Sequence, residues 1–334
     1  MNPEQFGSKT MNSETTMNTH TTKTRTAALL AAALITLGAG TATGQTIPIE
    51  TVQINGAASP NAADSATGSR YGAVSYDYYI GTKEVTNAQY AQFLNAVAAQ
   101  SDTYALYNTD MASTGLTRSG SAGNWTYTAT DPNKPVVYVS FWDAARFCNW
   151  LTSGETEVGV YDFGGVTNPT NNTVSRNAAA WATGGWALPT EDEWYKAAYY
   201  NPATDSYSLY PTGKDTIITS DANYLASGIG ASTNAGSYAA NPNGIFDMAG
   251  NVWEWNDAII NTFDRGVRGG AFDDNDSELA SSVRNYGTAA DRIDYVGFRV
   301  AALYLTAVPE PATYAALAGL AMLGWAALRR RGSR

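Results

Sequence analysis

Three stretches of the chain repeat apolar side chains at helical spacing, and each follows the same capping signature. A Ser or Thr stands three residues before an acidic or amide side chain, so that each side chain accepts a backbone N–H at the start of a helix. The apolar residues that follow recur every three or four positions and form one stripe that packs inward. The predicted helices begin after Thr86, Ser140 and Thr190, with the stripes Tyr90, Phe93, Leu94 and Val97, then Ala144, Phe147, Cys148 and Leu151, then Trp194, Ala197 and Ala198.

The same pattern of apolar and polar residues predicts only a few short strands. Residues 76–85 and 135–139 read as short strands. Gly, Asn, Thr, Ser and Pro dominate 101–134, 154–185 and 200–243, which is typical of loops and hairpins. Loops of this length need internal tethers, and we expect buried Trp, Asn-mediated turns and bound ions to supply them.

The N-terminal end has the marks of a secretory signal peptide. Two basic residues precede an apolar run at 27–37 and small residues at 38–44. That order is typical of a segment removed during export, here with a cut near Gly44, whereas the flanks do not suit a short buried helix. We therefore expect a leader over 1–44, followed by an N-terminal extension and the start of the folded domain over 45–75.

The C-terminal end, 306–334, carries a second processing signal. Pro-Glu-Pro precedes an apolar stretch at 312–328 and three arginines at 329–331. The stretch is barely long enough to span a bilayer as a helix, and the arginines behind it would stay cytoplasmic. This arrangement resembles the PEP-CTERM sorting signal. The resemblance implies export by the Sec machinery, processing by an exosortase, and delivery to the envelope, surface or extracellular matrix of a Gram-negative bacterium. A plain tail anchor is the alternative.

Composition narrows the chemistry. The formal net charge of -10 argues against nucleic-acid binding, which needs basic patches, and suits divalent cations outside the cell. The single histidine, His20, lies in the leader, so the mature chain has no imidazole for a Ser-His-Asp triad or a histidine-ligated metal site. The single cysteine, Cys148, cannot form an intramolecular disulfide, and its place in an apolar helical stripe predicts a small core residue.

Six blocks in fixed order resemble the formylglycine-generating-enzyme (sulfatase-modifying-factor) family. The resemblance covers about 76–301 and implies the α+β, loop-rich fold of that family, related to C-type lectins, as a domain over 76–305. The blocks are EVTNAQYAQFLNAV at 84–97, PVVYVSFWDAARFCNWL at 135–151, LPTEDEWYKAA at 188–198, NGIFDMAGNVWEW at 243–255, RGGAF at 268–272 and GFRVA at 297–301.

The resemblance fails where the family's chemistry resides. Active members carry two cysteines after the Gly-Gly pair that bind copper and activate oxygen. In this chain the first position falls on Asp274 and the second on Leu279, or on Ala280 with one inserted residue. A carboxylate and an apolar side chain cannot hold Cu(I) between two sulfurs. We therefore expect no catalytic residue and no copper.

Three function classes stay open. The first is a surface-sorted, non-oxidase module that binds an extracellular peptide or glycan or serves a structural role. The second is an enzyme with altered chemistry in the same cleft. The third is an oxidoreductase of the formylglycine-generating type, which would require a thiol source that the sequence lacks.

A candidate pocket and a candidate metal site follow. Asp273, Asp274 and Asp276, with Arg284 close behind, could bind a cation or a polar ligand, although their spacing does not match an EF-hand and a solvated loop is the alternative. The family resemblance also implies a structural calcium at the GNVWEW turn, because calcium prefers carboxylate and carbonyl oxygens. Trp253 and Trp255 are expected to pack beneath that turn. The implied calcium ligands are Asp247, Gly250, Val252 and Glu254.

Overall fold

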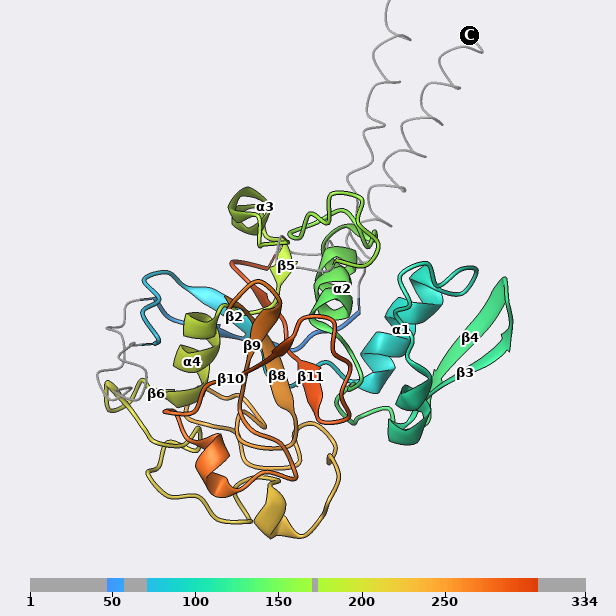
Figure 1. The fold of residues 1–334 in the computed structure, drawn as a ribbon. Helices are drawn as coiled ribbons and strands as arrows, with labels where there is room; N and C mark the ends of the chain where they lie inside the picture. The colour runs from blue at the N-terminus through green and yellow to red at the C-terminus, as the bar shows by residue number, and fades with distance from the viewer. Residues whose placement is uncertain (1–46, 57–70, 170–173, 306–334) are drawn as a thin grey trace, which may run out of the picture. The chain divides into compact units, whose positions relative to one another are not determined.

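The computed structural model describes residues 47–56, 71–169 and 174–305 (Figure 1). These residues belong to one compact unit that begins at Ala42. The predicted leader and sorting segment lie outside the described residues, and so does the predicted C-terminal apolar helix. Within the described part of the chain, no helix is long and apolar enough to cross a membrane.

All three predicted capping boxes are confirmed. They start α1 (Asn87–Val97), α2 (Phe141–Ser153) and α4 (Glu191–Tyr199), and in each box the cap side chain accepts the third amide while the third side chain accepts the cap amide. In α2, for example, the Asp143 amide donates to Ser140 Oγ over 3.1 Å and the Ser140 amide donates to Asp143 Oδ2 over 2.9 Å. These bonds satisfy amides that would otherwise lack partners at the helix ends.

The four residues of the apolar stripe predicted for α2 are buried, as expected, but the opposite face is buried as well, because every side chain from Phe141 to Leu151 lies inside the protein. The loop after the helix folds over its polar face and supplies hydrogen-bond partners there. Asn149 Nδ2 donates to the Tyr161 carbonyl over 2.7 Å, and Arg146 Nε donates to Glu157 over 2.7 Å. Burial of polar side chains without such partners would cost several kcal/mol.

Two small sheets support the helices. The first has the order β1–β2–β12–β5 and is antiparallel; the second has the order β10–β9–β8–β11, in which β8 and β11 run parallel. The first sheet comprises β1 (Thr51–Ile54), β2 (Tyr78–Gly81), β5 (Trp186–Ala187) and β12 (Ala301–Ala302); the second comprises β8 (Trp253–Ile259), β9 (Asp264–Arg268), β10 (Asn285–Thr288) and β11 (Val296–Phe298).

The two predicted strands are correct only in part. The stretch 76–85 contains β2, but 135–139 forms no strand. Pro135 makes an isolated bridge to Thr86, and the Val136 amide donates to the Val85 carbonyl over 2.9 Å. Two features stop a ladder there. Proline has no N–H to donate, and Tyr138 has a φ of 59°, outside the extended region.

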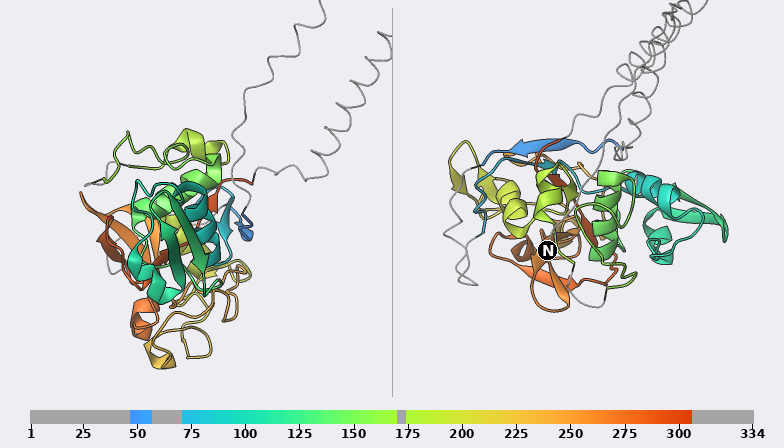
Figure 2. Two further views of the ribbon diagram at one scale, coloured as in Figure 1. Left: turned by 90° about the vertical axis from the view of Figure 1, so that its right-hand side faces the viewer. Right: turned by 90° about the horizontal axis from the view of Figure 1, so that it is seen from above.

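The predicted loops carry short elements and asparagine tethers, as expected. Asn95 accepts from the Tyr127 amide over 2.9 Å and so ties the β3–β4 hairpin to α1; Figure 2 shows this hairpin at the edge of the body. Asn241 Nδ2 donates to the Ala197 carbonyl over 2.9 Å and fixes a loop on α4. The short elements are η1 (Thr109–Thr114), β3 (Leu116–Ser121), β4 (Asn124–Ala129), α3 (Ala178–Ala182), β6 (Tyr200–Asn201), β7 (Ser206–Tyr207), η2 (Leu225–Ser227) and η3 (Asp276–Leu279).

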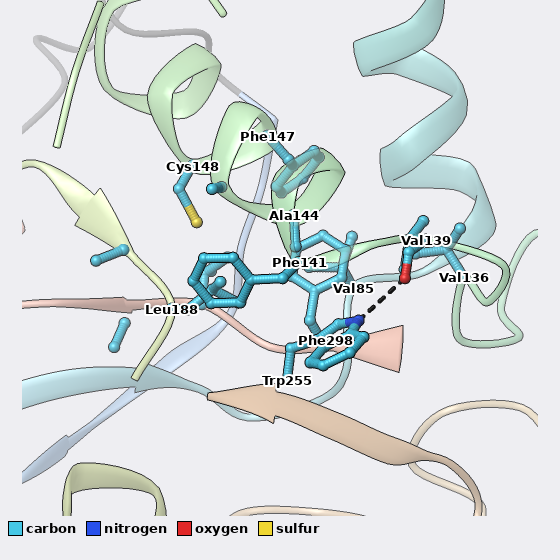
Figure 3. Packing of buried hydrophobic residues seen from close by; sticks show 14 of the residues in the cluster. Val85, Val136, Val139, Phe141, Ala144, Phe147, Cys148, Leu188, Trp255 and Phe298 are labelled. Carbon is cyan, nitrogen blue, oxygen red and sulfur yellow. Dashed lines mark hydrogen bonds between the residues drawn. The ribbon is translucent and has the colours of Figure 1, made fainter. Parts of the chain in front are cut away.

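Aromatic side chains join α2 to the second sheet (Figure 3). Phe147 lies 5.4 Å from Phe298 of β11 between ring centroids, and Trp255 of β8 donates its indole N–H to the Val139 carbonyl over 3.0 Å. Trp253 and Trp255 are both buried, as predicted. Cys148 is a free, fully buried thiol in the same core, which confirms its predicted role.

Candidate functional site

The GNVWEW block forms a sharp turn that leads into β8. Three residues of this turn have positive φ: Asp247 at 55°, Gly250 at 72° and Asn251 at 63°. Gly250 also lies so close to the backbone of Asn223 that a Cβ there would stand 2.1 Å from the Asn223 carbonyl oxygen. Only glycine fits this position, because it tolerates positive φ and has no side chain.

Glu254 follows the turn as a fully buried carboxylate in a dense hydrogen-bond network. Its Oε2 accepts from Trp194 Nε1 over 2.7 Å and from Arg299 Nε over 2.6 Å, and its Oε1 accepts from Arg299 Nη2 over 2.5 Å. Arg299 also donates to the carbonyls of Gly81 and Phe246 over 3.0 Å. The bidentate pair therefore links α4, β8 and the segment after β11.

The carboxylate of Glu84, which was not among the predicted site residues, lies beside the Glu254–Arg299 pair. Glu84 is 1% exposed; its Oε1 accepts from Asn251 Nδ2 over 2.8 Å, whereas its Oε2 is buried without a hydrogen-bond partner among the described residues. Burial, and next the negative charge of Asp247, raise the pKa of Glu84 well above its usual range. A sequence signal existed, since Glu84 is an acidic residue beside Val85 in a segment read as a strand.

Asp247 completes the group at its partly open edge. It is 8% exposed and accepts from the Gly236 amide over 2.5 Å. Burial is the main cause that raises the pKa of Asp247 to about 6. Three carboxyl groups face one buried guanidinium here, with the partly exposed ammonium of Lys83 at the rim, and burial favours the protonated forms of Glu84 and Asp247.

The structure thus brings Asp247, Gly250 and Glu254 together around one turn, but it does not form a three-carboxylate cage. Among the described residues, no three His, Cys, Asp or Glu side chains are grouped closely enough to hold a metal ion. The reason is that Glu254 is turned toward Arg299. Whether a calcium ion binds beside the partnerless oxygen of Glu84 stays a prediction.

The four side chains of the predicted acidic pocket do not converge on one point. Arg284 makes a bidentate pair with Glu191, with its Nη2 2.8 Å from Oε2. Asp274 accepts from the Ala271 amide over 2.9 Å and so closes a turn. The other two, Asp273 and Asp276, are exposed.

Two residues of the predicted acidic pocket, Asp273 and Asp274, affect Tyr295 together with two further aspartates. Burial first, and then Asp273, Asp294, Asp274 and Asp291, raise the pKa of Tyr295. Arg284 does not contribute to that effect. Whether the acidic set binds a ligand stays a prediction.

Leu279 fills an apolar cluster of its own. Its side chain is fully buried with Tyr210, Ala222, Tyr224, Ala249 and Ala280. A Cβ on Gly270 would stand 2.7 Å from Leu279 Cδ1, so the leucine is packed directly against the Gly-Gly pair. The space around this position is therefore occupied by aliphatic and aromatic carbon.

Comparison with known proteins shows which family has this architecture. The sequence model described as "Sulfatase-modifying factor enzyme 1-like domain" matches residues 39–303, which is most of the chain. The chain belongs to this family. The model of the PEP-CTERM protein-sorting motif matches residues 307–331 and implies exosortase-dependent export to the envelope or surface of a Gram-negative bacterium.

Individual relatives of this family member are distant. The chain is 26% identical over 180 residues to serine/threonine-protein kinase pkn1 of Chlamydia caviae, covering 54% of this chain and 22% of the kinase. It is 31% identical over 144 residues to hercynine oxygenase of Mycobacterium tuberculosis, covering 37% of this chain and 33% of the oxygenase. The chain thus spans a third or less of the length of these curated relatives.

A solved structure supports the fold. Treponema denticola variable protein 1 superposes with a TM-score of 0.58 at 20% identity, covering 78% of this chain and 98% of that protein. The α+β, loop-rich fold expected for the sulfatase-modifying-factor domain is therefore confirmed. Likeness at this identity shows the fold alone, and function must be argued from the residues.

Proposed function

We propose that this member of the sulfatase-modifying-factor family is an exported, non-oxidase module that binds a peptide or glycan outside the cell. The observation that supports it most directly is the pair Asp274 and Leu279. Aligned with the family, these residues stand where copper-binding thiols would be needed. One accepts a backbone amide and the other is packed in an apolar cluster.

The thiol chemistry has no other source in the chain. Cys148 is the single cysteine, and it is fully buried in α2. Burial raises the pKa of the Cys148 thiol well above its usual range, so the reactive thiolate is disfavoured. Cu(I) selects soft sulfur ligands, and neither a carboxylate nor an aliphatic chain replaces them.

The first prediction concerns copper and oxidation. The purified full chain, treated with Cu(I) and desalted, should retain copper well below one ion per chain and form no aldehyde on a cysteine-containing sulfatase peptide. The double variant Asp274→Cys with Leu279→Cys is the matched control, since it restores both thiols in place. Stoichiometric copper on the parent chain, together with aldehyde detected by mass spectrometry, would refute the non-oxidase proposal.

Binding itself is tested separately. The same preparation, applied to glycan and peptide arrays, should give a saturable signal with one of the two ligand kinds. A blank on both arrays would leave a purely structural role as the better explanation of the fold.

We further propose that a structural calcium ion binds at the turn before β8. Of the expected ligands, Asp247 would contribute a carboxylate oxygen, and Gly250 and Val252 would contribute backbone carbonyls. Glu84 would replace Glu254, whose oxygens already accept from Trp194 and Arg299. Calcium would supply positive charge where three carboxylates face one buried guanidinium. In this way it would fix the turn and the loop at Gly236 that bonds to Asp247.

The second prediction uses Glu84→Gln to test that ion. Calcium at about 100 times its dissociation constant should stabilise the parent chain by about 2.7 kcal/mol relative to EDTA. Glu84→Gln should lose most of this gain, because an amide replaces the partnerless carboxylate oxygen. In EDTA the variant should be about as stable as the parent, since the raised pKa of Glu84 favours its neutral form, which glutamine resembles in shape and charge.

Urea unfolding with and without calcium measures both effects. The matched control is Glu50→Gln, which alters an exposed carboxylate and should keep the full calcium gain. An equal calcium gain in Glu84→Gln and in the parent would place the ion elsewhere. If calcium did not stabilise the parent chain, the calcium proposal would be wrong.

A further inference from the structure

A small surface cavity opens at the N-terminus of α2, apart from the turn at Gly250. Its volume is about 50 Å³. Buried polar and aromatic side chains form its floor, and Asn168 and Ala290 are exposed at its rim. The residues that matter for its chemistry are Tyr104, Trp142, Asp143, Arg146, Asn168 and Arg292.

The cavity lining includes a residue with a buried hydrogen-bond donor that has no partner among the described residues. Trp142 is 4% exposed, and its indole N–H is buried without a partner among the described residues. Arg146 and Arg292 both donate through Nε and Nη2, which leaves Nη1 of each without a hydrogen-bond partner in the described part of the chain. A partnerless buried donor costs free energy, and an acceptor oxygen of a ligand would relieve it. The start of α2 adds the positive end of a helix dipole.

Charge at the cavity is already balanced. Arg292 forms a bidentate pair with Asp143, at 2.7 Å and 2.9 Å, and Arg146 pairs with Glu157 over 2.7 Å. Asp102 adds a further negative charge near Arg292. An anion would therefore meet no surplus of positive charge, so the donors suit a neutral oxygen, such as a carbonyl or a hydroxyl.

The size of the cavity and the chemistry of its walls limit which ligand group can bind there. A cavity of about 50 Å³ exceeds what one water requires but holds only a few heavy atoms. Tyr104, Pro169 and Ala290 line it with carbon, while the indole and guanidinium groups provide donors. An acetamido group matches both properties, because its carbonyl oxygen accepts hydrogen bonds and its methyl group packs on apolar walls.

We propose that this cavity binds the acetamido group of an N-acetylated amino sugar, with the sugar ring at the rim near Asn168 and Arg292. Ring hydroxyls donate and accept, which suits an exposed amide and an arginine side chain that is 27% exposed. This inference rests on the proposed binding function and names its ligand class. It assigns Trp142 as the residue that distinguishes an acetamido sugar from its deacetylated form.

The test titrates N-acetylglucosamine into the uniformly ¹⁵N-labelled full chain and follows the indole N–H signals by NMR. One signal, assigned to Trp142 by its absence in Trp142→Phe, should shift saturably. Glucosamine and acetate should not reproduce the shift. Trp142→Phe should weaken binding about fivefold, as expected for the loss of one neutral hydrogen bond, and should lower Tm, because phenylalanine fills less of the core than tryptophan does.

Two variants control for indirect effects. Trp150→Phe also removes a buried, partnerless indole N–H, but Trp150 does not line the cavity, so binding should be unchanged. Ala290→Leu at the exposed rim should block the cavity and abolish binding without lowering Tm.

Several results would overturn the inference. These are a Trp142 signal that does not move, equal binding by parent and Trp142→Phe, a stronger response to acetate or phosphate, or a stronger response to N-acetylglutamine amide, which would indicate a peptide. If array glycans bind the parent, Trp142→Phe and Ala290→Leu equally, the cavity assignment fails while the binding proposal stands. If no array ligand binds the parent, the proposed function itself fails.

Discussion

Glu254→Gln is expected to destabilise the protein by about 3–5 kcal/mol, the usual cost of leaving one member of a buried ion pair without its partner. Arg299 is fully buried, and both carboxylate oxygens of Glu254 accept hydrogen bonds from its guanidinium group. A glutamine would present an NH₂ group to the guanidinium in place of one oxygen. The loss should appear in EDTA, so that it is separate from any effect on calcium.

The matched control for this prediction is Glu50→Gln, which breaks the Lys83–Glu50 pair at the surface. Those side chains are 37% and 74% exposed, and exposed pairs contribute between zero and about 1 kcal/mol. Equilibrium urea unfolding of both variants gives the comparison. Equal stabilities of the two variants would show that the Glu254–Arg299 pair does not hold β8 to the segment after β11.

Gly250→Ala is expected to cost about 4 kcal/mol or more. Two penalties add at this position. A residue with a side chain at positive φ is strained by about 1–3 kcal/mol, and the new Cβ would meet the Asn223 carbonyl oxygen at 2.1 Å. Because that atom belongs to the backbone, the turn must shift, and the bond from the Asn251 amide to the same oxygen would be lost.

Gly244→Ala, in the same sequence block, is the control that has the backbone strain without the steric clash. Gly244 also has positive φ, at 80°, but a Cβ there would meet nothing within 4 Å. This variant should therefore cost only about 1–2 kcal/mol, the strain of the backbone conformation alone. Thermal and urea unfolding of the pair test the difference. If Gly250→Ala were no worse than Gly244→Ala, the close approach of Asn223 would not constrain the turn.

Local signals in the sequence predicted the helix starts well, because a capping box is satisfied by residues three positions apart. Thr86, Ser140 and Thr190 each cap a helix as expected. The strand predicted at 135–139 failed because strand pairing depends on a distant partner and on backbone geometry at Tyr138. The stripe predicted for α2 is buried as expected, but burial of the polar face was not predictable, because it depends on a later loop that covers that face.

The candidate calcium turn was predictable only in part. Family resemblance pointed to Asp247, Gly250, Val252 and Glu254, which lie within eight positions of one another in the sequence. Glu84 lies 167 residues from Asn251, its hydrogen-bond partner, and no local pattern reports such a contact. The pairing of Glu254 with Arg299 was likewise invisible before the chain was folded.

The sequence by itself determined which chemistry is unavailable. A chain with one cysteine and one histidine cannot supply both thiolates of a two-cysteine copper site or more than one imidazole, whatever its fold. The tertiary structure alone decided which polar groups lack partners. Glu84 and Trp142 are ordinary residues in the sequence, and they became candidate binding groups because packing left Glu84 Oε2 and Trp142 Nε1 buried without a hydrogen-bond partner.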